Sequence, residues 1–390
     1  MPDRTPSAED DPPATDGRQV LVVGDGLVGL SAAAFLSRRG LDPTVVAGPA
    51  DRPAGQEAVE RCVVLWPSAV ALLAEIGVIA EVAPASVEIG TWLVSSREGT
   101  VLDRLETAHG GSDDHPFLAV DRRRLGRVLR DRLRTNSVRV TKRPRRLRSD
   151  GGFPEVEFED GVSERFDLVV GADGSDSWVR AAGFPTPNPG HRGTTTWSFR
   201  ADGAGEPGTV GEAWGADAMV ALVPTASGTC GRLVTTTDEA VAAAEALARF
   251  ERDGHPVTRA LDPPGPDGLV GSVDRVVRPD AWVSGRLALV GDAARSLPPC
   301  SLALSLAVED THVLAEELAA TGCPAALERY EHRRRERLQR LDRRLSADGT
   351  GRHPLTAAGF PDLLELRLAL LRSSFARRPS PSGVSSTERR

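Results

Sequence analysis

The fold is decided by one stretch of sequence, Arg18-Gln-Val-Leu-Val-Val-Gly-Asp-Gly-Leu-Val-Gly29, in which an apolar run passes without a gap into three glycines. The apolar residues up to Val23 predict a short buried strand. Small residues after the glycines predict a helix that continues to about Arg39 and is closed by Gly40. Another apolar run, Asp42–Val46, predicts a second strand, so the first fifty residues are expected to form a β-α-β unit.

The glycines Gly24, Gly26 and Gly29 are spaced as Gly-x-Gly-x-x-Gly. In this pattern the first glycine permits a tight turn, the second lets the backbone approach a pyrophosphate, and the third lets helix and strand pack closely. The helix that follows presents free N–H groups and a partial positive charge to phosphates. The placement between a strand and a helix predicts a dinucleotide site, and the alternative is a glycine-rich turn in an ordinary β-α-β unit.

Two later segments each end a predicted strand with a carboxylate. Phe166–Val170 leads into Gly-Ala-Asp173-Gly174, and Leu287–Val290 leads into Gly291-Asp292-Ala-Ala. Ligands bind at the carboxyl ends of strands in open α/β sheets, and an aspartate there can accept from a ribose or ribityl hydroxyl. The three segments are therefore expected to converge on one extended ligand.

Other parts of the chain have weaker patterns. Val63–Ile76 and Val120–Arg134 predict helices, and the segments 87–106 and 194–276 predict short strands broken by Gly, Pro and Asp. After Pro324 the sequence predicts helix to about residue 344, with the Arg-rich run 333–344 on a solvated face. Leu363–Phe375 is amphipathic and is expected to pack against the fold or a partner, with a membrane surface as the alternative.

Composition excludes several classes of function. A formal net charge of −7 argues against a nucleic-acid partner. Seven histidines without metal-ligand spacing predict no metal site, and four scattered cysteines without a C-x-x-C pair predict a reducing, cytoplasmic setting. The run Ala69–Ala85 carries Glu75 and Glu81, and no apolar run approaches 18 residues, so no stable membrane insertion is expected.

The order of the motifs resembles the FAD-dependent monooxygenases of the para-hydroxybenzoate hydroxylase type. The glycine-rich turn comes first, then Asp173-Gly174 followed by Arg180, then Gly291-Asp292-Ala-Ala before Pro298-Pro299. Smaller likenesses are Leu65-Trp66-Pro67-Ser68, Arg122-x-x-Leu125 and Leu327-Glu-Arg-Tyr-Glu331. The resemblance spans about residues 18 to 344 and implies a Rossmann-like α/β domain for FAD, an inserted β-rich substrate layer and C-terminal helices.

The resemblance also implies which residues contact the cofactor, namely Gly24, Gly26, Gly29, Arg122, Asp173, Gly174, Gly291, Asp292 and Pro299. The three glycines would contact the pyrophosphate, and Arg122 would reach the phosphates or the flavin. Asp173 would help to secure the cofactor, and Asp292 would hold the ribityl chain. Pro299 would lie against the isoalloxazine ring.

The implied reaction uses NAD(P)H to reduce the flavin and oxygen to hydroxylate an aromatic or other cyclic small molecule. NAD(P)H is expected as a transient co-substrate, because the chain has only one dinucleotide fingerprint. The flavin performs the oxygen transfer, so no catalytic side chain is named. Two alternatives share the same motifs: a flavin-dependent reductase or dehydrogenase on this fold, and a non-catalytic homologue that binds flavin or another ligand. The oligomeric state is left open.

The resemblance implies that the FAD-binding domain is assembled from separate segments. The predicted division is a disordered tail at 1–17, an FAD-binding domain from 18–85, 115–185 and 286–322, a β-rich substrate layer from 86–114 and 186–285, C-terminal helices at 323–377, and a disordered tail at 378–390. Trp92, Trp197 and Trp214 fall in the β-rich layer, where they either line a substrate pocket or pack in the core.

Two positions depart from the family pattern. Ala47 stands where an acid normally accepts hydrogen bonds from the adenosine ribose, and Asp51 is a candidate replacement. The segment Cys300-Ser-Leu-Ala303 contains no glycine where the family has a glycine-rich loop. These losses predict weaker FAD binding or a displaced flavin ring, and the alternative is that backbone N–H groups at the helix start do the same work without glycine.

Overall fold

The computed structural model describes residues 18–48, 62–106, 115–134, 137–139, 142–149, 152–185, 189–251, 254–297 and 301–346. Its first layer is a six-stranded sheet in the order β18-β19-β12-β1-β2-β8, parallel except where β18 meets β19. The strands are β1 (Gln19–Val23), β2 (Asp42–Val46), β8 (Val138–Arg139), β12 (Leu168–Gly171), β18 (Val283–Ser284) and β19 (Leu287–Leu289). β1 lies at the centre of this sheet because its apolar residues are buried between helices and neighbouring strands.

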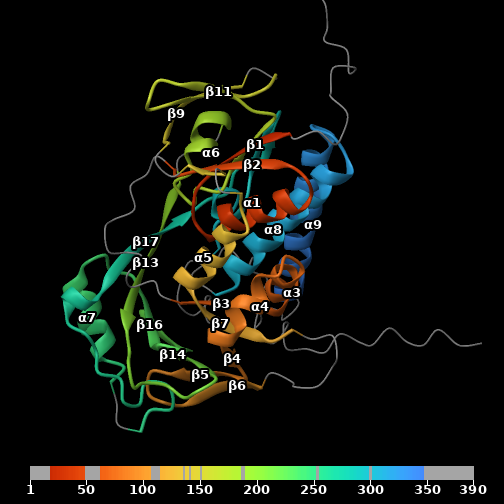
Figure 1. The fold of residues 1–390 in the computed structure, drawn as a ribbon. Helices are drawn as coiled ribbons and strands as arrows, with labels where there is room; N and C mark the ends of the chain where they lie inside the picture. The colour runs from red at the N-terminus through yellow and green to blue at the C-terminus, as the bar shows by residue number, and fades with distance from the viewer. Residues whose placement is uncertain are drawn as a thin grey trace, which may run out of the picture.

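Four helices complete this layer. They are α1 (Leu27–Arg38), α5 (Arg122–Asp131), α8 (Leu302–Ala320) and α9 (Ala325–Ser346). α1 packs against α5 and α8, and α8 packs against α9, so the first and the last of the described helices belong to the same layer (Figure 1). The predicted fold class, a Rossmann-like α/β arrangement assembled from separate segments, is confirmed.

A seven-stranded sheet forms the second layer, in the order β17-β13-β16-β15-β14-β5-β6. Its strands are β5 (Thr91–Ser96), β6 (Val101–Glu106), β13 (Gly190–Arg200), β14 (Thr209–Trp214), β15 (Ala218–Thr225), β16 (Gly228–Thr235) and β17 (Val270–Val276). Helix α7 (Ala240–Ala248) covers one face, where Val220, Leu222 and Leu233 join a separate hydrophobic core (Figure 1). Since side chains alternate along a strand, the intervening residues point to the opposite face, toward the first layer.

A three-stranded sheet joins the two layers, in the order β3-β7-β4. β3 (Cys62–Leu65) and β4 (Val87–Ile89) both pair with β7 (Phe117–Asp121), and β15 of the large sheet packs against β3 and β7. The prediction of a helix over Val63–Ile76 is therefore wrong for its first residues. The apolar pair Val63–Val64 lies in strand β3, and helix α3 (Pro67–Glu75) begins only at the proline, which favours the first helical position.

The predicted helix over Val120–Arg134 also begins too early. β7 continues to Asp121, whose side chain accepts a hydrogen bond from the Arg124 backbone N–H at 2.7 Å and so caps α5. The sequence pattern assigned Val120 to the helix, although Asp121 and three arginines separate it from Leu125, the first buried residue of α5.

The remaining elements lie at the edges of the layers. They are α4 (Val78–Val82), α6 (Trp178–Gly183), the antiparallel sheet of β9 (Pro144–Arg148), β10 (Glu155–Phe158) and β11 (Ser163–Arg165), and the 3-10 helices Ala83–Ala85, Pro266–Gly268 and Gly291–Ala293. Among the described helices, no single one has the length and apolar character to cross a membrane, and only the pair Pro67–Glu75 and Val78–Ala85, bent by 105°, does so on those two criteria.

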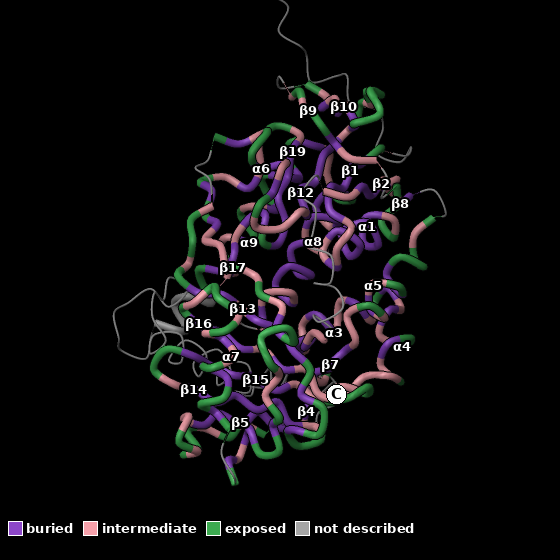
Figure 2. The backbone as a smooth tube through the Cα atoms, turned by 90° about the vertical axis from the view of Figure 1, so that its left-hand side faces the viewer, coloured by how far each residue is buried: buried purple, intermediate pink, exposed green. Residues whose placement is uncertain are grey.

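Burial follows the two layers. The main core runs through β1, β12, α1 and α8, and the second core lies between α7 and the large sheet (Figure 2). The tails, Leu363–Phe375 and Asp51 lie outside the described residues. The proposed division into domains stays a prediction.

Candidate functional site

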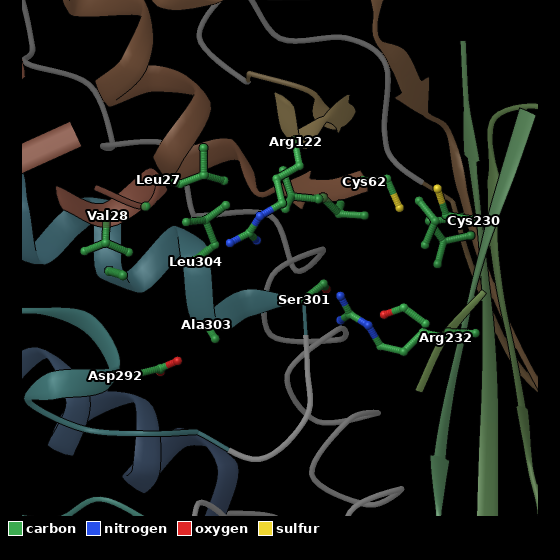
Figure 3. Close-up of a pocket in the computed structure, with 18 of the residues that line it drawn as sticks. Leu27, Val28, Cys62, Arg122, Cys230, Arg232, Asp292, Ser301, Ala303 and Leu304 are labelled. Carbon is green, nitrogen blue, oxygen red and sulfur yellow. The ribbon is translucent and has the colours of Figure 1, made fainter. Parts of the chain in front are cut away.

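A cavity of about 330 Å³ lies between the six-stranded and seven-stranded sheets (Figure 3). Its volume falls at the lower end of the range for small-molecule sites. One wall, here called the turn wall, comes from the strand-end turns of the first layer and from the start of α8. The other, the sheet wall, comes from the inner face of the seven-stranded sheet and from β3.

The turn wall begins at the glycine-rich turn. Gly24 has φ +116°, and a Cβ atom there would lie 2.3 Å from the Ala172 carbonyl oxygen. A Cβ atom at Gly29 would lie 1.8 Å from the Gly24 carbonyl oxygen. Both obstacles are backbone atoms, so the turn between β1 and α1 can form only with glycine at these positions. The Gly24 N–H donates to the Val46 carbonyl at 2.8 Å, which fixes the turn to the end of β2.

The start of α1 faces the cavity. Gly26, Leu27 and Val28 line it, and the N-cap residue Gly26 offers no side chain to the N–H groups of the first helical turn. Free N–H groups and the helix dipole at such an end attract an anion. The observed geometry therefore suits a phosphate group.

Asp173 does not line the cavity, although the adjacent Ala172 and Gly174 do. Its Oδ2 accepts hydrogen bonds from the backbone N–H groups of Trp178 at 2.7 Å and Val179 at 3.2 Å, so the carboxylate orders the start of α6. Its Oδ1 is buried and has no hydrogen-bond partner among the described residues. Burial raises the pKa of Asp173, an effect that a hydrogen bond from the Ser177 side chain and the backbone hydrogen bonds oppose only in part.

Arg180 links the two aspartate turns. Its buried guanidinium donates to the Ala293 carbonyl at 3.0 Å and also to the Ser175 carbonyl. One side chain thus ties the turn after β12 to the turn after β19. The sequence showed Arg180 as part of the motif but gave no sign of this bridging role.

The turn after β19 places Asp292 on the turn wall. Gly291, before it, has φ +61°, and its N–H donates to Asp310 Oδ2 at 3.0 Å. Desolvation by the surrounding protein raises the pKa of Asp292 to about 6, with a further contribution from the negative charge of Asp310, while Arg192 acts in the opposite direction. The Asp292 side chain is accessible from the cavity, and the protein that surrounds it on its other sides raises its pKa.

A buried ionic cluster supports this turn from behind. The Arg334 guanidinium, 3% exposed, donates to Asp310 Oδ1 at 2.6 Å, Glu309 Oε2 at 2.9 Å and the Leu306 carbonyl at 3.1 Å. The prediction that the Arg-rich run lies on a solvated face is wrong at this position. Arg334 falls on the same face of α9 as the buried Tyr330, and that spacing was the signal available in the sequence.

Arg122 and the start of α8 complete the turn wall. Figure 3 shows the Arg122 guanidinium directed into the cavity beside Leu304. Ser301, Ala303 and Leu304 also line the cavity, and the Ser301 hydroxyl accepts from the indole N–H of Trp66 at 3.1 Å. Pro299 and Cys300 lie outside the described residues.

The sheet wall carries a polar row across four strands. Glu212, Ala221, Arg232 and Ser198 are consecutive partners in the registers of β14, β15, β16 and β13, and all four line the cavity. Because the small Ala221 stands between the acid and the arginine, the two charged groups border an open notch. The Arg232 guanidinium makes no hydrogen bond or ion pair with another described residue.

Two tryptophans donate hydrogen bonds to Glu212, the acidic residue of this row. Glu212 is 1% exposed, and its carboxylate accepts from the indole N–H groups of Trp92 at 3.0 Å and Trp214 at 3.2 Å. Of the three predicted tryptophans, only Trp92 lines the cavity. Trp197 packs in the outer core and donates to the Thr235 hydroxyl at 3.0 Å.

An apolar row lies beside the polar one. Val223 and Cys230 are register partners on β15 and β16, and Val210 of β14 and Met219 of β15 line the cavity with them. Cys62 of β3 meets this surface at Cys230 (Figure 3). Sequence analysis found none of the sheet-wall residues except Trp92, because their relation depends on the pairing of strands and not on a contiguous motif.

The structure therefore separates the nine predicted cofactor residues into two groups. Gly26, Arg122, Gly174 and Asp292 line the cavity. Gly24, Gly29, Asp173 and Gly291 stand behind the wall, where they shape its turns. Pro299 belongs to neither group, because it lies outside the described residues.

Comparison with known proteins matches most of the chain to one family. The family model described as "FAD binding domain" matches residues 18–344. An aurachin C monooxygenase/isomerase of Stigmatella aurantiaca is 29% identical over 338 residues, covering 82% of this chain and 86% of the relative. An FAD-dependent urate hydroxylase of Klebsiella pneumoniae is 28% identical over 357 residues, covering 83% and 87%.

Solved structures show a similar fold. The crystal structure of Klebsiella pneumoniae HpxO complexed with FAD and uric acid aligns with a TM-score of 0.73 at 25% identity, covering 92% of each chain. The tetracycline destructase Tet(51) aligns with a TM-score of 0.64 at 18% identity, covering 93% of this chain and 99% of that one. At that lower identity the likeness concerns the fold alone.

Proposed function

The chain belongs to the FAD binding domain family, and on that premise we propose that it is an FAD-dependent monooxygenase that uses NAD(P)H and oxygen to hydroxylate an aromatic or other cyclic small molecule. The observation that carries this proposal is the two-walled cavity. A backbone wall suited to a dinucleotide faces a wall of side chains suited to a small organic molecule. The named relatives, a urate hydroxylase and an aurachin C monooxygenase/isomerase, support the reaction class.

The residues of the turn wall fit FAD. The start of α1, with Gly26 at its N-cap, would receive the pyrophosphate, because its first residues line the cavity and no side chain caps its N–H groups. Asp292 would accept hydrogen bonds from ribityl hydroxyls, and Arg122 would face the phosphates or the flavin. Gly24 and Gly29 would act indirectly, since they allow the turn to form.

Asp173 would hold the cofactor through the atom that the protein leaves unpaired. Its Oδ2 accepts hydrogen bonds from the start of α6, while Oδ1 is buried without a hydrogen-bond partner among the described residues. Burying a polar atom without a hydrogen-bond partner lowers the stability of the fold by about 1 to 3 kcal/mol, and a hydrogen bond from a ligand hydroxyl would offset this loss. Asp173 is therefore proposed both to order the turn and to contact the cofactor.

When bound, FAD supplies the electron transfer and oxygen chemistry that side chains lack. The protein binds and orients it, and the apolar lining of Val28, Leu304 and Met219 limits water in the cavity. No side chain is assigned as an acid or base.

The sheet wall favours a ring that carries an acidic group. Arg232 offers a cation that makes no hydrogen bond or ion pair with another described residue, and the Glu212 carboxylate, which accepts from two indole N–H groups, lines the same cavity. Val210 and Val223 would contact the apolar body of the ring. We therefore infer a planar substrate with an ionised oxygen at Arg232 and an N–H or O–H directed to Glu212.

The test begins with the purified chain under anaerobic conditions. FAD is titrated in, followed by NADPH or NADH, and flavin absorbance is recorded. The proposal expects stoichiometric FAD that loses its visible absorbance on reduction. A protein that binds no FAD, or whose bound flavin neither nicotinamide reduces, would contradict it.

Oxygen uptake then separates a monooxygenase from the reductase alternative. Aromatic and heterocyclic acids are screened alongside their neutral amides for oxygen uptake, and products are analysed by mass spectrometry. The monooxygenase proposal expects a product that has gained one oxygen atom. Flavin reduction with no hydroxylated product from any substrate would favour a reductase.

A further inference from the structure

Two cysteines meet at the substrate end of the cavity. Cys62 belongs to β3 in the three-stranded sheet, and Cys230 belongs to β16 in the seven-stranded sheet. Both line the cavity, and Figure 3 shows their sulfur atoms side by side at the junction of the two sheets. The two thiols hydrogen-bond to each other, so the sulfur atoms are close together.

The position of the pair is separate from the turn wall. Leu27 and Val28, at the start of α1, lie at the opposite end of the cavity in Figure 3. Cys230 is two residues from Arg232 on the same strand and points to the same face. A covalent change at the pair would therefore act on the proposed substrate region and leave the dinucleotide region intact.

We propose that Cys62 and Cys230 form an oxidisable dithiol site that takes hydrogen peroxide as its oxidant, and that the resulting disulfide narrows the substrate end of the cavity. The inferred effect on substrate rests on the proposed function, whereas the bond itself does not.

The reaction balances as two thiols and one peroxide giving one disulfide and two waters. One sulfur, after loss of its proton, attacks a peroxide oxygen; the O–O bond breaks, and one water leaves with formation of a sulfenic acid. The second sulfur then attacks the first, its proton and the hydroxyl group leave as the second water, and the S–S bond forms. The sulfurs lose two electrons in total, and the peroxide gains them.

The surroundings determine how readily the pair reacts. The hydrogen bond from Cys230 and burial hold the pKa of Cys62 well above its usual value, and the nearby Arg232 opposes this only in part. Since the thiolate is the reactive form, the pair reacts slowly at neutral pH. The test therefore uses excess peroxide and a long exposure.

Peptide mapping tests the bond directly. The full chain is loaded with FAD, treated with hydrogen peroxide, denatured in a thiol-blocking reagent and digested without reduction. The proposal expects a cross-linked peptide pair that contains Cys62 and Cys230, has lost two hydrogens, and separates with dithiothreitol. Two separately blocked or over-oxidised residues, or a bond to Cys300 or Cys323 instead, would overturn it.

A trivalent arsenical provides a second measurement that does not depend on peroxide. Phenylarsine oxide bonds two adjacent thiols through one arsenic atom and releases one water. The pair should bind one arsenical per chain across Cys62 and Cys230. Failure of the arsenical to bridge the two in the folded chain would show that the sulfurs are too far apart and would also overturn the proposal.

Activity measurements test the effect on substrate. Within each protein, turnover is compared before and after peroxide, then after dithiothreitol. The unmodified chain and the Cys323→Ser control, altered in a buried cysteine away from the cavity, should lose at least about tenfold in substrate-dependent turnover and recover it, with FAD content unchanged. Cys230→Ser should show no such reversible loss.

The two proposals fail in different ways. If the chain turns over no substrate, the proposed function fails, yet the mapped bond still decides whether the dithiol site exists. If the bond forms and turnover is unaffected, the inferred narrowing of the substrate end is wrong.

Discussion

The two walls of the cavity are built in different ways. The turn wall is formed largely by short turns at the ends of strands, such as Gly24–Gly29 after β1, together with Arg122 and the start of α8. The sheet wall consists of side chains contributed by several paired strands, as in the row through Glu212, Ala221 and Arg232. Short contiguous motifs specify most of the first wall, whereas the register between paired strands specifies the second.

This difference determines which residues of the cavity tolerate substitution and which do not. The turn wall must keep Gly24 and Gly29, because backbone atoms occupy the space that a side chain at either position would need. The sheet wall keeps its shape when a side chain is exchanged, because strand pairing uses backbone hydrogen bonds. We therefore expect changes in the turn wall to abolish cofactor binding and changes in the sheet wall to alter substrate preference.

The largest effect on cofactor binding is expected for Gly29→Ala. Its Cβ atom would lie 1.8 Å from the Gly24 carbonyl oxygen, so the turn must open and FAD affinity should fall at least about a hundredfold, or about 2.7 kcal/mol. FAD retained after gel filtration measures this, with circular dichroism as a check on folding. The matched control is Gly126→Ala on α5, where the new Cβ makes an ordinary 3.6 Å contact with Leu27. Full FAD retention by Gly29→Ala would refute the comparison.

The second effect concerns the support behind the turn wall. Arg334→Met leaves Asp310 buried without its cation and Glu309 with only the more exposed Arg337, which should lower the free energy of unfolding by about 3 to 5 kcal/mol. Urea denaturation measures it. The control is Arg340→Met, because Arg340 is 56% exposed and pairs with Glu336 at the surface, where the cost is about 1 kcal/mol or less. Equal losses of unfolding free energy in the two variants would mean that the buried cluster stabilises the fold no more than a surface ion pair does.

Substitution of Arg232 tests the sheet wall. Arg232→Met should raise the KM of an acidic substrate found by the oxygen-uptake screen about 10- to 100-fold, the value of a charge-assisted hydrogen bond of about 1.5 to 3 kcal/mol. Arg232→Lys keeps the positive charge and should raise the KM by a smaller factor. The FAD dissociation constant should not change in either variant. A matching loss of FAD affinity would show that the two walls do not act separately.

The position of Ala47 tests whether the turn wall is complete. Ala47 follows β2, where an acid would accept from the adenosine ribose, so Ala47→Glu should tighten FAD binding by about tenfold, or about 1.4 kcal/mol. Ala47→Gln is the control, because it matches the size without the charge and should gain less. Fluorescence titration of FAD measures both. An unchanged affinity would indicate that another group already holds the ribose.

The contrast between the walls also explains what the sequence could predict. The β-α-β unit and the two aspartate turns were predictable because strand, turn and helix are contiguous there, and β2 was found with its observed bounds, Asp42–Val46. The boundary at Leu65 was missed, because an apolar run before a helix has the same pattern whether it is strand or helix.

Residues of the candidate site were predictable only on the turn wall. Even there, the pattern did not distinguish Gly174, which lines the cavity, from Asp173, whose Oδ2 orders α6. The facing of Glu212 and Arg232 depends on the register between paired strands, and that of Cys62 and Cys230 depends on the packing of two separate sheets. No single-sequence pattern carries that information, since a shift of one residue in register would turn each side chain to the other face.

The smallest predicted effect is the pH dependence that Asp292 gives to the cofactor-free protein. Its pKa is raised from 3.8 to about 6, so between these values the folded chain holds a proton that the unfolded chain releases. The contribution of Asp292 to stability is therefore present below about pH 3.8 and is lost as pH rises through about 6. Because the side chain is accessible from the cavity, solvent screening should limit the change to about 1 kcal/mol or less.

Asp292→Asn removes this titration, so the difference in unfolding free energy, native chain minus variant, should fall as pH rises from 4 to 7. Urea denaturation across that range measures the difference and cancels every other titrating group. The same variant should bind FAD less tightly above pH 6, because an amide accepts from hydroxyls more weakly than a carboxylate. Asp292 would then lower the stability of the cofactor-free protein and favour binding of the cofactor. A difference that stays constant with pH would place Asp292 in solvent and remove it from that wall.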